Sequence, residues 1–457
     1  MIDLLVHNAR LVVTMDDQRR ELPGGWVAID KGFVVGTGAS SDLPPTAHDL
    51  LDARDGLVTP GFVNTHHHIY QNLTRAFGPA LEGNLFHWLR TLYPVWSRLD
   101  EEAAYLSAYV GLVELALGGC TTSTDHLYVH PRSGGKLIDA EILAARDVGM
   151  RFHPTRGSMS LSVKDGGLPP DDVVQDDDEI LADSERLVLT YHDRSPGALV
   201  QIALAPCSPF SVTPDLMRRT AELAERLDVR LHTHLAEDAD EDAYALDRFG
   251  CRTIDHFESV GWMTERSWVA HCVRPNAAEV ARLGAATVGV AHCPSSNQMI
   301  GAGLAPISEL RLAGVPVGLG CDGSASTDCA SLWLEARAAL LLGRLRGGAA
   351  AMRARDVIEM ATIGGAACPG RGHDLGRLAP GYAGDLVVWP LDGISFAGAV
   401  SDPVEALLRC GPVAARHTVV HGKTVVRDGL PLASDLDDVL RRHGAVARSW
   451  FDAATGG

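Results

Sequence analysis

Residues 57–68 have the sequence LVTPGFVNTHHH, in which an apolar strand runs into three consecutive histidines. An open α/β sheet that binds a dinucleotide would carry a glycine-rich phosphate loop after its first strand, and this chain has histidines there instead. Because side chains alternate along a strand, His66 and His68 point to one side and His67 to the other. The outer two histidines can therefore chelate one cation, which favours a barrel with its site at the strand ends.

The middle of the chain, up to about residue 367, alternates short apolar runs with longer amphipathic stretches. Amphipathic stretches such as 214–227, with Thr213 as the predicted N-cap, are typical of helices. Eight alternations of strand and helix predict an α/β fold, a distorted (β/α)₈ TIM barrel enlarged by loop insertions. The eight predicted strands are 57–64, 120–126, 150–156, 199–206, 229–235, 267–271, 286–292 and 315–322.

Both ends of the chain have a different sequence pattern from the middle. They contain short runs rich in β-branched residues, typical of strands, around glycine-containing turns. Two strand-rich ends that flank one long middle predict a single small β-sandwich domain built from both chain ends. We place this domain at residues 1–56 and 376–432, the barrel at 57–375 and a C-terminal helical tail at 433–457.

Composition restricts the partners and the compartment. The chain has 457 residues and a formal charge of −18, without any run of lysine or arginine, so neither a nucleic acid polymer nor a membrane is expected as a partner. Its nine cysteines form no CxxC pair, which predicts reduced thiols rather than a disulfide framework. We find no signal peptide and no apolar stretch of about 18 residues, and we therefore expect a cytoplasmic protein.

Polar side chains gather at the carboxyl ends of the predicted strands, where a barrel places its active site. His66, His68, His234 and Asp322 are the candidate metal ligands, because three imidazoles, one carboxylate and an open position suit zinc or a similar ion. Such an ion lowers the pKa of its bound water to about 7. Glu237 follows His234 by three residues, and we predict that it faces the cavity and shuttles protons without touching the metal.

Other histidines and acidic residues have plainer interpretations. His232 faces the same way as His234 but lies deeper, so we expect a packed, hydrogen-bonded role for it. His126 and His292 are open between contact with substrate and support of the ligands. The acidic run at 171–179 is interpreted as a solvated loop.

A planar substrate needs a slot with apolar walls and a few fixed hydrogen-bond partners. Gln71 follows His68 by three residues, and its amide can both donate to and accept from a ring edge. Trp88, Tyr128, Phe210 and Cys207 are candidate walls, although such residues are core packing at least as often.

Four blocks resemble the signature motifs of the amidohydrolase superfamily, in the family's order: PGFVNTHHH at 60–68, HTHLAE at 232–237, HC at 271–272 and LGCDG at 319–323. The resemblance covers essentially the whole chain and is closest to the aminohydrolase branch that holds guanine deaminase, triazine hydrolases and 8-oxoguanine deaminase. The stretches that look most like 8-oxoguanine deaminases are HHHIYQNLTR at 66–75, TTSTDHLY at 121–128, APCSPFSV at 205–212, HCPSSN at 292–297 and DGSAS at 322–326.

The resemblance implies roles for individual residues. One divalent metal ion per subunit, zinc in preference to iron, would be held by the four candidate ligands named above. Glu237 would protonate a ring nitrogen, and Asp322 would accept the proton of the metal-bound water. His271 would orient that water or polarise the scissile centre, in contact with the substrate. Superfamily habit implies a homo-oligomer.

The scarcity of lysine supports one metal rather than two. Binuclear relatives bridge their metals with a carboxylated lysine at a strand end. The chain has four lysines, and neither of the two in the predicted barrel, Lys136 and Lys164, lies at a predicted strand end.

We therefore predict a hydrolase of C–N bonds in cyclic amidines that releases ammonia from 8-oxoguanine or a related purine or pyrimidine. The alternatives are an s-triazine chlorohydrolase or aminohydrolase and, from another class, a non-catalytic scaffold protein. Two departures leave the identity of the ring open. QMI stands at 298–300 where the resemblance predicts an arginine-containing turn, and STD at 326–328 where it predicts SND.

Overall fold

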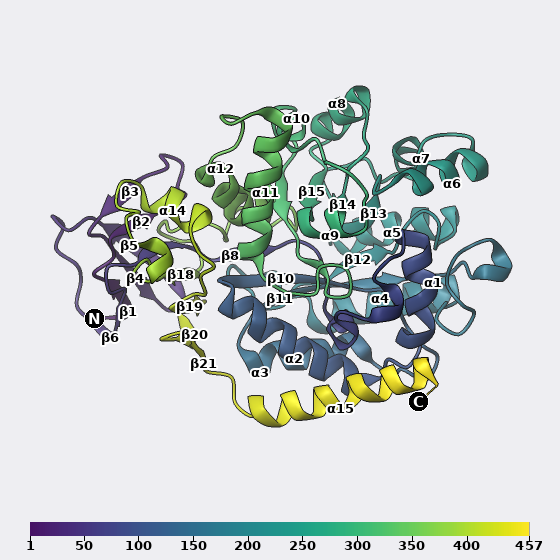
Figure 1. Ribbon diagram of the computed structural model, residues 1–457, viewed down its shortest axis with the longest axis horizontal. Helices are drawn as coiled ribbons and strands as arrows, with labels where there is room; N and C mark the ends of the chain where they lie inside the picture. Colours follow the sequence, from purple (N-terminus) through teal and green to yellow (C-terminus); the bar gives the residue numbers. More distant parts are fainter. Residues whose placement is uncertain (457) are drawn as a thin grey trace.

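The computed structural model describes residues 1–456, and its largest unit is a closed barrel of eight parallel strands surrounded by helices (Figure 1). Each strand pairs with the next in chain order, and the last strand closes on the first through Leu319 and Asn64. The predicted (β/α)₈ barrel is therefore confirmed. Its strands are β8 (Phe62–Asn64), β10 (Cys120–Leu127), β11 (Arg151–Ser158), β12 (Ala203–Pro206), β13 (Leu231–Leu235), β14 (Ser267–His271), β15 (Gly289–His292) and β16 (Val317–Leu319).

Capping residues explain where the outer helices begin and end. Helix α5 (Pro214–Leu227) begins at the predicted cap, because the Thr213 hydroxyl accepts a hydrogen bond from the Leu216 N–H at 2.9 Å. The helix ends at Asp228, which adopts the left-handed conformation. Further helices around the barrel are α3 (Leu137–Val148), α4 (Asp177–Tyr191), α6 (Ala239–Phe249), α7 (Thr253–Ser259), α8 (Ala277–Ala285), α9 (Pro294–Met299), α10 (Ile307–Leu312), α11 (Leu332–Gly347) and α12 (Ala354–Glu359).

The strand predicted at 57–64 is wrong as a single element. It is split into β7 (Leu57–Pro60), which pairs outside the barrel with β18 (Leu386–Trp389), and the barrel strand β8. Gly61 lies at the break, where a Cβ atom would stand 2.0 Å from the Thr121 Oγ1. Only glycine leaves room for the Thr121 side chain here, and the chain changes from one sheet to the other at this point.

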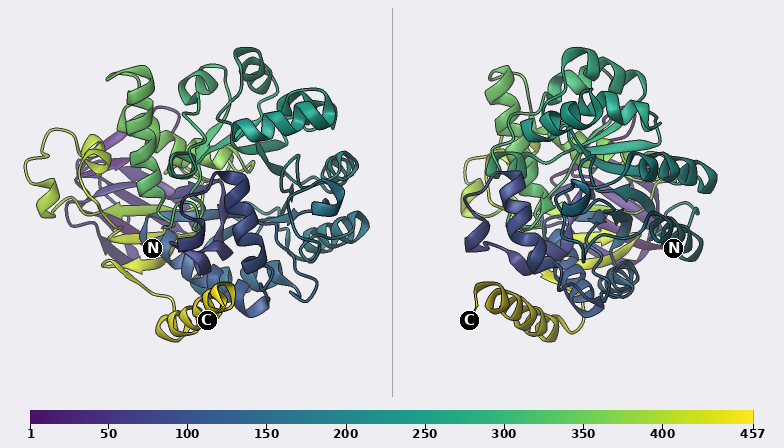
Figure 2. Two further views of the ribbon diagram at one scale, coloured as in Figure 1. Left: turned by 45° about the vertical axis from the view of Figure 1, so that its right-hand side comes forward. Right: turned by 90° about the vertical axis from the view of Figure 1, so that its right-hand side faces the viewer.

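Two further sheets lie at one side of the barrel and contain strands from both chain ends, purple and yellow in Figure 2. Buried side chains of the two sheets, such as Ile29 and Val388, pack against each other, as expected for the predicted β-sandwich domain. The exact domain boundaries stay a prediction. The four-stranded sheet contains β5 (Phe33–Gly38), β4 (Trp26–Asp30), β1 (Ile2–His7) and β6 (Ala47–Asp52), and the seven-stranded sheet contains β21 (Leu430–Pro431), β20 (Lys423–Arg427), β19 (His417–Val420), β18, β7, β2 (Leu11–Val13) and β3 (Glu21–Pro23).

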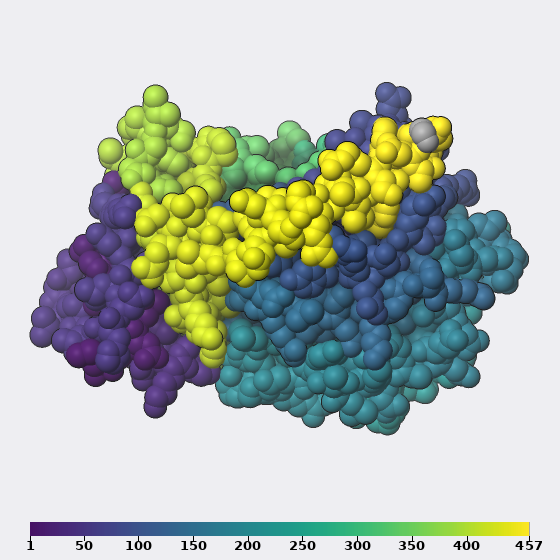
Figure 3. All heavy atoms as spheres, turned by 90° about the horizontal axis from the view of Figure 1, so that it is seen from below, coloured from purple at the N-terminus to yellow at the C-terminus, as the bar shows by residue number. Residues whose placement is uncertain are grey.

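The chain ends in a long helix, α15 (Leu436–Thr455), which lies across the outside of the barrel domain (Figure 3). It packs on α2 (Glu101–Leu117), with Val439 and Trp450 buried beneath it. Helix α1 (Leu85–Trp96), which precedes α2 in the chain, lies over the barrel mouth.

A cluster of buried charges joins the start of β11 to the seven-stranded sheet. Arg151 forms an ion pair with Asp385, and Arg371 donates to Asp374 at 2.6 Å. The Asp374 carboxylate also accepts from the Gly197 N–H at 3.0 Å. All four charged residues are buried, and none of their fully buried side-chain nitrogens and oxygens lacks a hydrogen-bond partner. We call these four residues the junction cluster.

All nine cysteines are free thiols, as predicted. None of the helices between residues 1 and 456 combines the length and the apolar character needed to cross a bilayer.

Candidate active site

Unusual backbone conformations at three strand ends bring the predicted site residues together. Ala236, His271 and Asp322 have φ angles of 53°, 70° and 57°. This left-handed region costs a residue other than glycine about 1–3 kcal/mol, and such strain is concentrated at functional sites. Asp322 begins the short strand β17 (Asp322–Gly323), which pairs in parallel with β9 (His67–His68). That pairing fixes the carboxylate beside the histidines that follow β8.

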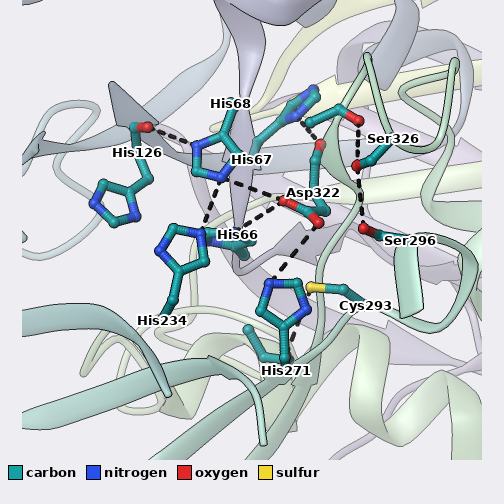
Figure 4. Close-up of polar contacts among 12 residues, drawn as sticks. His66, His67, His68, His126, His234, His271, Cys293, Ser296, Asp322 and Ser326 are labelled. Carbon is teal, nitrogen blue, oxygen red and sulfur yellow. Dashed lines mark hydrogen bonds and ion pairs between the residues drawn. The ribbon is translucent and has the colours of Figure 1, made fainter. Parts of the chain in front are cut away.

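Three imidazole rings and one carboxylate converge on one point (Figure 4). The Nε2 atoms of His68 and His234 lie 3.1 Å apart. The Asp322 Oδ1 lies 3.2 Å from the His66 Nε2 and 3.3 Å from the His68 Nε2. The structure thus brings together all four residues that the sequence proposed as ligands.

The spacing of these atoms fits one shared metal ion. Zinc–nitrogen bonds of about 2.0–2.1 Å place neighbouring ligand atoms roughly 3 Å from one another. The separations in this cluster are 3.1–3.3 Å. The His66 Nε2 is buried and has no hydrogen-bond partner within the described residues. Two facing imidazole nitrogens and a lone acceptor need a cation among them, because buried polar atoms are otherwise costly.

The outer nitrogen of each imidazole is held by a hydrogen bond, which leaves Nε2 free for a metal. The His68 Nδ1 donates to the backbone oxygen of His126 at 2.7 Å, and the His234 Nδ1 donates to that of Cys207 at 2.6 Å. The His66 Nδ1 lies 2.8 Å from the His232 Nε2. Such partners fix the tautomer and orientation of ligating histidines. His232 therefore has the packed, hydrogen-bonded role expected for it.

Burial sets the ionisation of the cluster. It lowers the pKa of His66, His68 and His234 below the ordinary value, so these rings stay neutral and can act as ligands. Burial alone would raise the pKa of Asp322, but the His66 imidazole beside its carboxylate and the other nearby imidazoles bring it well below its usual range. The site therefore presents neutral nitrogens and one anion.

Glu237 and His271 stand beside this cluster. The His271 Nε2 lies 3.6 Å from the Glu237 Oε1 and 3.8 Å from the Asp322 Oδ2. Its Nδ1 lies 2.9 Å from the Asn297 Oδ1, to which it can donate. Burial and then the charge of Asp322 raise the pKa of Glu237 well above its usual value, which favours a protonated carboxyl.

A second carboxylate, Glu241, holds the loop that carries Glu237. Its two oxygens accept from the backbone N–H groups of Ala236 and Glu237, each at 2.8 Å. Glu241 lies on α6, four residues after Glu237, and is buried. Glu241 is not among the predicted site residues, although a carboxylate one helical turn beyond Glu237 is a visible signal in the sequence.

The cluster opens into a cavity beneath α1. Of the predicted substrate contacts, Trp88, Cys207 and His271 line this cavity, as do the candidate walls Tyr128 and Phe210. The remaining lining residues are His68, Leu85, Leu89, Tyr93, Ser208, His234, Glu237, Ser296, Ile300, Asp322 and Ser326. Leu85, Leu89 and Tyr93 recur every four residues on one helix face, a period that could have revealed them.

Gln71 and His126 are not among the residues that line the cavity. Gln71 lies behind the wall, with its Nε2 3.3 Å from the Tyr128 hydroxyl and its Oε1 buried without a partner. The His126 Nε2 lies 2.9 Å from the backbone oxygen of Ala205. Contact of either residue with substrate stays a prediction.

The two sequence departures lie near the same cavity. Ile300 lines it, whereas the neighbouring Met299 points outward with 62% of its surface exposed. Thr327 turns its hydroxyl toward the Gly323 oxygen at 3.2 Å, and Asp328 accepts from the Ala76 N–H at 2.6 Å. Of these residues, Ile300 is thus the one placed to meet a substrate.

Comparison with known proteins gives a consistent result. The sequence matches the profile of the amidohydrolase family over residues 57–425. It is 50% identical to the 8-oxoguanine deaminase of Pseudomonas aeruginosa, over 93% of this chain and 94% of that protein. It is 37% identical to the hydroxydechloroatrazine ethylaminohydrolase of Pseudomonas sp. strain ADP, over 94% of each chain. The zinc complex of atrazine chlorohydrolase TrzN from Arthrobacter aurescens TC1 superposes with a TM-score of 0.93 at 34% identity, covering 97% of this chain and 100% of that one.

Proposed function

The chain belongs to the amidohydrolase family and is a hydrolase acting on C–N bonds, and on this premise we propose that it deaminates 8-oxoguanine. The observation that carries the proposal is the convergence of four ligand atoms beside Glu237 and His271 in one cavity. The choice of 8-oxoguanine as the substrate rests on the 50% identity to the 8-oxoguanine deaminase.

We propose that His66, His68, His234 and Asp322 hold one divalent metal ion per subunit, zinc in preference to iron. Three imidazoles and a carboxylate are a donor set that zinc accepts. When bound, the ion supplies a water whose pKa is lowered to about 7.

The protein side chains then move the protons. Asp322 is ionised and takes a proton from the attacking water, while Glu237 is protonated and gives its proton to a ring nitrogen next to the carbon under attack. His271 lies between the two carboxyl groups and orients the reacting groups. A C–O bond forms at the carbon under attack. Asp322 passes the proton it took to the amino group, so that the C–N bond breaks and ammonia leaves. The remaining hydroxyl proton returns to Glu237, and the ring leaves in its oxo form.

The cavity walls suit a flat ring. Trp88 is fixed by a hydrogen bond from its Nε1 to the Ala325 oxygen at 3.0 Å, and Phe210 packs on Phe86 with ring centroids 5.3 Å apart. Rigid aromatic walls favour a planar ligand through apolar and stacking contacts.

An ammonia-release assay on zinc-loaded protein tests the proposal. We expect the highest kcat/KM for 8-oxoguanine in a panel that also contains guanine, isoxanthopterin, cytosine and an aminated s-triazine. A higher kcat/KM for any other ring would contradict the proposed substrate and leave the reaction class standing.

A triazine hydrolase is the second candidate, favoured by the TM-score of 0.93 to atrazine chlorohydrolase. It predicts release of chloride or an alkylamine rather than ammonia, so the leaving group distinguishes the two. A non-catalytic scaffold would require an intact fold with no bound zinc or iron in metal analysis. Assembly as a homo-oligomer and location in the cytoplasm stay predictions.

A further inference from the structure

Most polar atoms in the cavity wall are already engaged with the protein. The Ser326 hydroxyl donates to the Gly323 oxygen at 3.0 Å and accepts from Ser296 at 3.1 Å. Ser208 pairs with the Ser211 hydroxyl at 2.7 Å, and Ser211 donates to the Ser208 backbone at 3.1 Å. These hydroxyl protons are not free for a ligand.

Two tyrosines, Tyr93 and Tyr128, line the wall. The Tyr128 hydroxyl accepts a hydrogen bond from the Gln71 amide at 3.3 Å. The Tyr93 hydroxyl, in contrast, is buried and has no hydrogen-bond partner among the described residues. The Tyr93 ring is fixed on α1, edge-on to Trp96 with centroids 6.0 Å apart.

A buried hydroxyl without a partner is unusual and indicates a missing ligand. Burial raises the pKa of Tyr93 well above its usual value, so the hydroxyl keeps its proton at neutral pH and can donate it. In the proposed function, Glu237, His271 and Asp322 face the amidine edge of the ring, where the reaction takes place. The group that meets Tyr93 is therefore an acceptor elsewhere on the ring.

We propose that the Tyr93 hydroxyl donates a hydrogen bond to a carbonyl oxygen of the substrate and so selects oxo-substituted rings. A carbonyl oxygen projects beyond the ring and offers two lone pairs to a donor in the wall. A site built around such a donor discriminates strongly against a ring that leaves it unpaired. The inference rests on the proposed function and narrows its substrate class to amino-heterocycles that carry a carbonyl.

The test is Tyr93→Phe, which removes the hydroxyl and keeps the ring. We expect kcat/KM for 8-oxoguanine to fall about tenfold, as for loss of one hydrogen bond. For 2,6-diaminopurine, which has no carbonyl, the variant should match the wild type, measured either as kcat/KM or as a competitive inhibition constant. The melting temperature of the free protein should not fall, because the removed hydroxyl bonds to nothing in the protein.

Tyr70→Phe is the matched control. The Tyr70 hydroxyl is likewise buried without a partner, but Tyr70 does not line the cavity, and we expect unchanged kinetics for both rings. An unchanged kcat/KM for 8-oxoguanine in Tyr93→Phe, or an equal fall for both rings, overturns the inference and leaves the proposed function intact.

Binding separates the two proposals if the wild type releases no ammonia from any ring. That result refutes the proposed function. Calorimetry with 2,6,8-trioxopurine, the product expected from 8-oxoguanine, then decides the inference for the zinc-loaded protein. A Kd about tenfold weaker in Tyr93→Phe supports it, whereas equal affinity, or no binding to the wild type, overturns it.

Discussion

Two clusters of buried ionisable side chains stand at opposite ends of the barrel and differ in how completely they are paired. In the junction cluster of Arg151, Asp385, Arg371 and Asp374, no fully buried side-chain nitrogen or oxygen lacks a hydrogen-bond partner. At the carboxyl ends of the strands, the His66 Nε2 has none, and neither has the Tyr93 hydroxyl.

This difference in pairing distinguishes a cluster that stabilises the fold from a cluster that can bind a ligand. A buried charge that is fully paired stabilises one arrangement of the chain and offers nothing to a ligand. A buried polar atom without a partner costs free energy in the free protein, and a ligand can recover that cost. The left-handed backbone at His271 and Asp322 adds a second cost at the same end of the barrel.

We expect the largest effect from removal of a proposed metal ligand at the carboxyl ends of the barrel strands. His234→Ala should lower the ratio of metal to protein and abolish turnover, because one of four converging ligand atoms is removed. Metal analysis by mass spectrometry and the ammonia assay measure this. His373→Ala is the control, since His373 is exposed and should keep both properties. A normal metal content in His234→Ala would show that His234 is not a ligand.

The next effect separates chemistry from metal binding. Glu237→Gln should leave the metal content near normal and lower kcat by a factor of about 10²–10⁴, the range for loss of a proton-transferring group. Glu279→Gln is the contrast, because Glu279 is a buried carboxylate already paired with Arg252. It should cost stability and leave kcat unchanged. Turnover retained in Glu237→Gln would remove Glu237 from the mechanism.

A substitution in the junction cluster should lower stability and leave metal binding unchanged. Arg151→Met leaves the buried Asp385 carboxylate without its ion-pair partner, and we expect the free energy of unfolding to fall by about 3–5 kcal/mol. Urea unfolding measures the change. The fraction that stays folded should bind a normal amount of metal. A fall in metal per folded protein would show that the two clusters are not independent.

The smallest effect is a difference in pH dependence. Burial lowers the pKa of His66, His126 and His234, so below about pH 6.5 the unfolded chain takes up protons that the folded chain does not. The free energy of unfolding of metal-free protein should therefore fall on acidification, by up to about 1.4 kcal/mol per pH unit for each histidine. Urea unfolding at pH 7.5 and 5.5 measures this. A curve that is flat between these values would contradict it.

The junction cluster should not contribute to that slope. Burial alone would raise the pKa of Asp374, but the hydrogen bond from Arg371 brings it below its usual value. Its stabilisation is present above about pH 4 and is lost only below that, as the carboxyl takes up a proton. Asp374→Asn should thus lower stability equally at pH 7.5 and 5.5.

The sequence was sufficient for parts of the structure that depend on local periodicity. Alternation along a strand predicted that His66 and His68 share a side, and both direct Nε2 into the cluster. Helix α5 begins at its predicted cap. These features need only neighbours along the chain.

Features that depend on tertiary approach were not predictable in this way. The break at Gly61 depends on Thr121, which comes from another strand. Asn297 meets His271 only because α9 folds back over the strand end. No periodicity in the sequence reports such contacts.

The stretch from β7 to β8 is shared by the outer sheet and the barrel, which limits how the barrel can be engineered. Residues 57–60 belong to the outer sheet, residues 62–64 belong to the barrel, and His66, the first proposed ligand, follows two residues later. The barrel is therefore not a portable module: cutting it out would free the strand that aims His66. The turn at Ile300 contributes to the cavity wall and lies outside this shared stretch, so exchange of that turn with relatives is a way to graft a new specificity.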